Sequence, residues 1–102
     1  MASMSVLATE YLHCKVVADD DPTGDVVQWA FLDRGTQWPN ETTTWVDGGW
    51  KPGSTAQDAV ARVLVGPENG GHPLTVGQYR VWLRITDNPE VPVKLAGYLT
   101  MS

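Results

Sequence analysis

Cysteine and histidine are scarce in this chain of 102 residues, and their scarcity limits the chemistry that the sequence can support. The single cysteine, Cys14, excludes an intramolecular disulfide. It lies among apolar residues, with no cation arranged to activate it, so we expect an inert and buried thiol. The two histidines, His13 and His72, are far apart in the sequence, and neither has a Cys or His neighbour at metal-ligand spacing.

Basic residues and long apolar runs are also few. Seven Lys and Arg against twelve Asp and Glu give a formal net charge of −5, so nucleic acid and anionic membrane surfaces would be repelled on average. Every apolar run falls far short of the roughly 20 residues that cross a bilayer. The first residues lack the basic and apolar regions of a secretory signal, which favours synthesis in the cytoplasm, and Met4 is a second candidate for the natural start.

Recognisable catalytic motifs are missing as well. The sequence has no Gly-x-Ser-x-Gly nucleophile elbow, and the glycine-rich run at 66–71 lacks the lysine and the following helix of a phosphate-binding loop. Carboxylates gather around Gly24 without the twelve-residue loop and closing Glu of a calcium site, so we interpret them as a solvated turn. These carboxylates belong to Asp19, Asp20, Asp21 and Asp25. We therefore predict no enzymatic activity, no cofactor and no metal.

Alternation of apolar and polar side chains is the main structural signal. It is clearest at 77–87, where Tyr79, Val81, Leu83 and Ile85 would share one face of a strand. Similar runs between Gly and Pro turns predict further strands at 10–18, 26–32, 59–65 and 93–101. Six or seven short, mostly antiparallel strands of this kind indicate an all-β sandwich or small barrel.

The length of the chain is that of one domain, which we place at 1–102. The N-terminus at 1–5 is expected to be able to move. The Gly, Pro and Thr content of 35–58 permits either a strand or an ordered loop.

Five tryptophans are the most informative residues. Trp29 lies on the apolar face of its predicted strand, where we expect it in the core. Trp82 faces away from the apolar side of its strand, between Arg80 and Arg84. Three interpretations stay open for Trp82: a second layer covers it, it is an exposed interface residue, or an arginine stacks on it and shields it.

The remaining tryptophans extend the predicted binding surface. Trp38 lies in a connection rich in Gly and Pro, while Trp45 and Trp50 flank a turn, where they could instead cover one end of the domain. The predicted binding residues are first Trp82, Arg80 and Arg84, and then Trp38, Trp45 and Trp50.

Several segments of the sequence together resemble small structural proteins from tailed bacteriophages and prophages of actinobacteria. They are 27–31 (VQWAF), 44–50 (TWVDGGW), 61–67 (ARVLVGP), 74–90 (LTVGQYRVWLRITDNPE) and 97–100 (GYLT). The resemblance implies an immunoglobulin-like β-sandwich that is part of a virion and is attached to the capsid or to the tail. It favours a capsid decoration protein or a head–tail accessory protein, synthesised in the cytoplasm of the bacterial host. The implied partners are capsid or tail and neck proteins, and homo-oligomerisation stays open.

A carbohydrate-binding module is the alternative function. Exposed tryptophan rings on a β-sandwich can stack on sugar faces, and five tryptophans supply candidates for such a platform.

Overall fold

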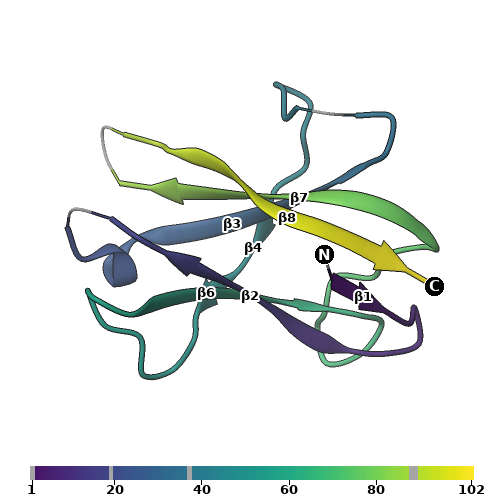
Figure 1. Cartoon of the computed structure of the whole chain (residues 1–102), viewed down its shortest axis with the longest axis horizontal. Coiled ribbons are helices and arrows are strands. Elements are labelled where there is room, and N and C mark those ends of the chain that lie inside the picture. The colour runs from purple at the N-terminus through teal and green to yellow at the C-terminus, as the bar shows by residue number, and fades with distance from the viewer. Residues whose placement is uncertain (1, 19, 37, 88–89) are drawn as a thin grey trace.

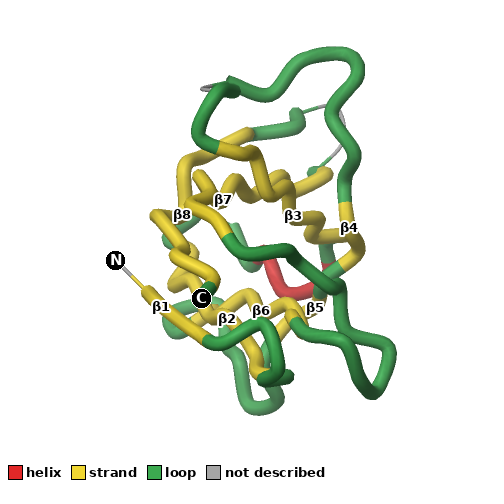
Figure 2. The backbone as a smooth tube through the Cα atoms, turned by 90° about the vertical axis from the view of Figure 1, so that its right-hand side faces the viewer, coloured by secondary structure: helices red, strands yellow, loops and turns green. Residues whose placement is uncertain are grey.

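The computed structural model describes residues 2–18, 20–36, 38–87 and 90–102, which fold into two β-sheets packed face to face. In Figure 1 the two sheets lie one above the other, and their strands run across the view. Figure 2 is turned by 90°, so that the same two layers are seen from one end of the strands. In chain order the elements are β1 (Ala2–Met4), β2 (Glu10–Val16), the short 3-10 helix η1 (Pro22–Gly24), β3 (Val26–Asp33), β4 (Val46–Asp47), β5 (Gly49–Trp50), β6 (Ala59–Val65), β7 (Gly77–Thr86) and β8 (Val93–Met101). The prediction of an all-β, sandwich-like architecture is confirmed.

The larger sheet has five strands in the order β1-β8-β7-β3-β4. β7 forms its centre, because it pairs in antiparallel fashion with β3 on one side and with β8 on the other. The β7–β8 register shifts between Val81 and Trp82, which is the mark of a β-bulge. The short β1 pairs in parallel with the end of β8, from Ala2 opposite Leu99 to Met4 opposite Met101.

The smaller sheet has three strands in the order β2-β6-β5. The chain crosses from the larger sheet to the smaller one at Gly48, because β4 pairs with β3 and the next two residues, in β5, pair with β6. The Gly48 N–H donates to the Val27 carbonyl at 3.0 Å, which fixes the crossing point against β3.

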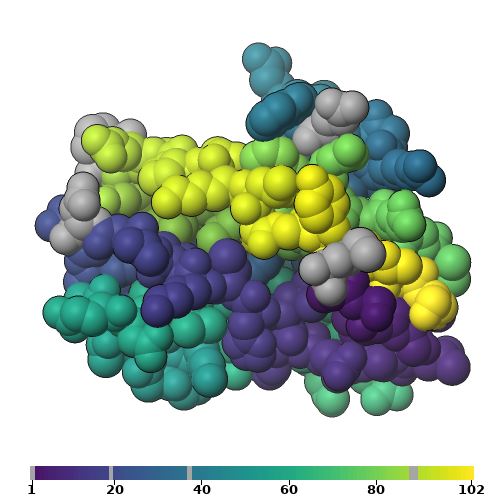
Figure 3. Space-filling view, in the orientation of Figure 1, coloured from purple at the N-terminus to yellow at the C-terminus, as the bar shows by residue number. Residues whose placement is uncertain are grey.

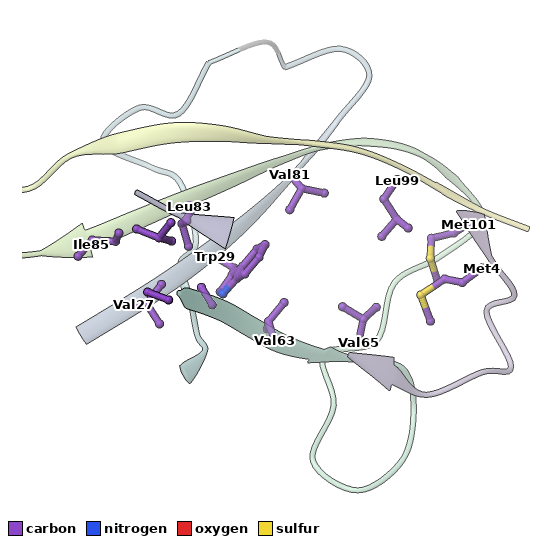
Figure 4. Close-up of a cluster of buried hydrophobic side chains, with 13 residues drawn as sticks. Met4, Val27, Trp29, Val63, Val65, Val81, Leu83, Ile85, Leu99 and Met101 are labelled. Atoms are coloured by element: carbon purple, nitrogen blue, oxygen red, sulfur yellow. The ribbon is translucent and has the colours of Figure 1, made fainter. Parts of the chain in front are cut away.

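The core fills the space between the two sheets with alternate side chains from each strand. Trp29 of β3 lies at its centre with 1% of its surface exposed, as the sequence predicted. Figure 4 shows Val63 of β6 and Val81 of β7 on either side of it, and Met4 and Met101 together at one end of the core. The alternation that predicted strands at 10–18, 26–32, 59–65, 77–87 and 93–101 thus corresponds to β2, β3, β6, β7 and β8.

The number of strands differs from the prediction. The described residues form eight strands rather than six or seven, because β1, β4 and β5 are two or three residues long and too short to show a period. The segment 1–5 was expected to move, yet 2–4 are paired and the Met4 side chain is buried, while Met1 lies outside the described residues. The described part of 35–58 is mostly loop, with β4 and β5 inside it.

Candidate functional site

The outer face of the five-stranded sheet brings together most of the predicted binding residues. β7 turns Arg80, Trp82 and Arg84 toward this face, opposite to the side chains that it sends into the core. In the register of β7 with β8, their partners are Tyr98, Leu95 and Val93, respectively. The bulge on β8 keeps these apolar side chains on the same outer face even though their spacing along the strand is irregular.

Trp82 is buried, which overturns its interpretation as an exposed contact residue. Only 6% of its surface is exposed, and it forms a second small cluster with Ala30 and Leu32 of β3, covered by Trp45. Trp38 lies against it from the connection between β3 and β4, with 5.2 Å between the ring centroids and 46° between the planes. A second layer therefore covers this face, which was one of the three interpretations open from the sequence.

Arg84 stacks on a tryptophan, but on a different one from that expected. Its guanidinium lies over the Trp45 ring, 4.3 Å from the centroid, rather than over Trp82. Its Nε donates to Oε1 of Gln28 at 3.1 Å, its Nη2 donates to the same oxygen, and the Gln28 amide donates to Asp47. These bonds hold the Arg84 guanidinium in place over the Trp45 ring.

The rim of this covered region remains apolar and exposed. Five large side chains, each 43 to 69% exposed, form what we call the apolar strip, and they are Trp38, Val91, Val93, Leu95 and Tyr98. Trp38, Val91 and Val93 also line a shallow, open depression of about 610 Å³ together with Asn40 and Glu41. Figure 3 shows β8 running along the surface in yellow and yellow-green, with the blue atoms of the β3–β4 connection projecting above it.

Sequence reasoning missed the β8 part of the strip. Val93 and Leu95 follow a period of two, but the bulge breaks that period before Tyr98. The pattern therefore gave no sign that all three residues share one face. The available signal was only that large apolar residues occur on both sides of the predicted strand, with Tyr98 opposite Val93 and Leu95 in a regular alternation.

Trp50 lies away from this surface and has a structural role. It packs against the main core from β5, and its indole Nε1 donates to the Asp25 carbonyl at 3.0 Å. This bond ties the turn before β3 to the smaller sheet. The six predicted binding residues are thus divided: five lie on the outer face of the larger sheet or over it, and Trp50 lies between the sheets.

The acidic turn between β2 and β3 has a local structural explanation. The Asp21 carboxylate caps η1 by accepting from the Thr23 backbone N–H at 3.0 Å and from its hydroxyl at 2.7 Å. These bonds hold the pKa of Asp21 below its ordinary value. Asp19 lies outside the described residues. Within the described ranges no three His, Cys, Asp or Glu side chains come together as a possible metal site.

Cys14 is half-buried on the inner side of β2. Burial raises the pKa of its thiol, and the nearby charge of Lys94 opposes this only in part. A raised pKa keeps the thiol protonated at neutral pH and therefore unreactive.

No protein-family model, curated protein or solved structure matches this chain. Across the described residues, no helix is long and apolar enough to span a membrane.

Proposed function

We propose that this chain is a non-enzymatic structural protein of a tailed-phage virion that docks on the capsid, or on the tail and neck, through the apolar strip. The strip carries the proposal, since five large apolar side chains stay exposed along one face of a small acidic domain. Other exposed apolar residues, such as Leu7 and Val17, lie elsewhere on the chain. Contiguous apolar surface is typical of sites that another protein covers.

The resemblance of the sequence to structural proteins of actinobacterial phages supports the choice of a virion as the larger assembly. A virion location would follow synthesis in the bacterial cytoplasm. The absence of a nucleophile elbow, a metal motif and a phosphate-binding loop from the sequence supports a function without catalysis. Capsid decoration and head–tail attachment are both compatible with a docking domain of this size.

We also propose that the sandwich is of the immunoglobulin kind. Three features support this finer assignment. The sheets combine β2, β6 and β5 in one layer and β8, β7 and β3 in the other, which is the partition of strands B, E and D and strands G, F and C. Trp29 is a buried tryptophan on β3, the strand that takes the place of strand C. Tyr79 at the start of β7 donates its hydroxyl to the Thr75 carbonyl at 3.0 Å, as in a tyrosine corner.

Docking by the face is favoured over docking by a strand edge. The part of β8 that β1 leaves uncovered carries Lys94 and the bulge, and the edge strand β2 carries Lys15 and His13 on its exposed side. Charged side chains and bulges are the devices that prevent a sheet edge from pairing with another chain. The apolar strip has no such protection.

The test is a pull-down with the purified, immobilised domain. Intact particles, isolated capsids and isolated tails of an actinobacterial tailed phage are passed over it, and mass spectrometry identifies what is retained. Retention of capsid protein would support decoration, and retention of tail or neck proteins would support attachment there. If no virion protein is retained, the proposal fails.

A matched pair of variants links any retention to the apolar strip. Leu95→Glu places a charge in the strip, whereas Leu7→Glu places the same charge on a leucine that is 85% exposed outside it. We expect the first variant to lose the partner and the second to keep it. Equal retention of the partner by both variants would show that the apolar strip does not take part in the binding.

Carbohydrate binding remains the second candidate, and one observation favours it. Trp38 lies with 69% of its surface exposed in a depression that also contains Asn40 and Glu41, so a flat ring and polar groups occur together. Tryptophan fluorescence titrated with soluble actinobacterial cell-wall polysaccharide is expected to change in the native protein and not in Trp38→Ala. A flat titration of the native protein would exclude this candidate.

A further inference from the structure

The apolar strip ends at a pocket that contains two arginines. Arg34 follows the end of β3, and Arg80 lies on β7 beside it, where its Nη1 donates to the Arg34 carbonyl at a long 3.3 Å. Both line a pocket of about 150 Å³ together with Gln78 and Tyr98. Tyr98 belongs to the strip as well, so pocket and strip are continuous.

Neither arginine has a countercharge in the described part of the chain. Arg34 and Arg80 form no ion pair there, although the protein carries twelve acidic residues. The closest acid in sequence, Asp33, uses its Oδ1 to accept from the Gly35 N–H at 3.0 Å. By contrast, Arg84 is bonded to Gln28 and Arg62 stacks on Tyr11 at 3.9 Å. Arg34 and Arg80 therefore bring two arginines with mostly unused donors to one pocket, whereas Arg62, whose contact with Tyr11 uses none of its donors, lies on the smaller sheet.

We propose that the pocket binds a carboxylate side chain of the protein partner that covers the apolar strip. The guanidinium fork matches a carboxylate with two parallel N–H···O bonds, and five donors per arginine leave most of this capacity free. The net charge of −5 disfavours a polyanion such as nucleic acid, while a single carboxylate within an apolar contact adds little repulsion. The partner therefore presents Asp or Glu beside apolar side chains.

This inference rests on the proposed docking function for its partner, but its chemistry can be tested without a virion. The probe is the peptide acetyl-Phe-Leu-Glu-amide, and its control is acetyl-Phe-Leu-Gln-amide, which has the same shape without the charge. Each is titrated into the full isotope-labelled chain, and the NMR signals of the arginine Nε–H groups and of Tyr98 are followed. Arg62, on the smaller sheet, serves as the internal control.

We expect the Glu peptide to bind with a Kd in the millimolar range and to shift the Arg34, Arg80 and Tyr98 signals, while the Arg62 signal stays in place. The Gln peptide should bind about tenfold more weakly, because the charged hydrogen bonds are lost. Arg80→Gln should weaken the Glu peptide by a similar factor, and Arg62→Gln should not. Added salt should weaken the Glu peptide more than the Gln peptide.

Three results would overturn the inference. They are equal shifts with both peptides, no shift with either, and tighter binding of an oligogalacturonate, which would assign the pocket to acidic sugars. The comparison of the two peptides uses the native chain, so it holds even if a variant misfolds. Peptide binding without virion retention would refute the proposed function alone, and virion retention without peptide binding would refute the carboxylate pocket alone.

Discussion

Trp38 covers Trp82 on the outer face of the larger sheet, with ring centroids 5.2 Å apart and planes inclined by 46°. One ring of this pair is 69% exposed and the other 6% exposed. The pair therefore joins a structural residue to a surface residue. Substitution of each ring separates the contribution of this face to stability from its contribution to binding.

Trp82→Ala is expected to lower the free energy of unfolding by about 3–5 kcal/mol, because it opens a cavity under Trp38 and Trp45. Trp38→Ala should lower it by only about 1 kcal/mol, since an exposed ring loses one aromatic contact. Urea unfolding of both variants measures the difference. If binding depends on the strip, Trp38→Ala should lose the virion partner while it stays folded.

A similar loss of stability in both variants would contradict this division. It would mean that the β3–β4 connection is as firmly packed as the strands. Trp45→Ala is a useful intermediate case, because that ring is half-buried and carries Arg84 on its face.

The orientation of Trp82 followed from the sequence, but its burial did not. Alternation along 77–87 places Trp82 opposite Val81 and Leu83, and the structure confirms that. The cover comes from Trp38 and Trp45, which lie in an irregular connection that has no period to analyse. Loop conformation depends on contacts distant in sequence, so the sequence left three interpretations of Trp82 open.

Gly48 offers a sharp test of the crossing between the sheets. A Cβ at this position would lie 2.5 Å from Cδ1 and Nε1 of Trp29 and 2.7 Å from the Arg62 carbonyl. Gly48→Ala should therefore destabilise the fold by about 2–3 kcal/mol, because a core ring or a backbone must move. The matched control is Gly49→Ala, whose Cβ meets nothing within 4 Å and should change stability by less than about 0.5 kcal/mol.

Thermal unfolding of the two alanine variants provides the measurement. A Gly48→Ala protein as stable as Gly49→Ala would show that the indole of Trp29 does not pack against the crossing point.

The hydroxyl of Tyr79 provides a test of the corner before β7. It donates to the Thr75 carbonyl and lies 3.1 Å from the Thr75 hydroxyl. Tyr79→Phe keeps the ring and removes these bonds, so the free energy of unfolding should fall by about 1 kcal/mol. Tyr98→Phe, on the exposed strip, is the control and should leave stability unchanged. Chemical denaturation that ranks the two variants equally would argue against a tyrosine corner.

The shortest strands mark the limit of what could be predicted. β1 has three residues, of which Met4 alone is buried, and its partner strand lies at the other end of the chain. A parallel pairing over such a sequence separation leaves no local signal. The long strands β3 and β7 were predictable because repeated alternation extends over seven residues or more.

His72 should make stability depend on pH. Its ring stacks on Phe31 with centroids 5.3 Å apart, and burial lowers the pKa of His72 below its ordinary value of 6.5. The unfolded chain then takes up the proton at a higher pH than the folded chain, so the free energy of unfolding falls as pH drops below 6.5 toward the folded pKa. Above pH 6.5 the contribution of the neutral ring to stability is fully present.

His72→Phe retains a ring against Phe31 but cannot titrate, so its urea midpoint should depend less on pH between 6.5 and the folded pKa than that of the native protein. An identical slope for the two proteins would mean that the His72 ring is as accessible to protons in the folded state as in the unfolded chain.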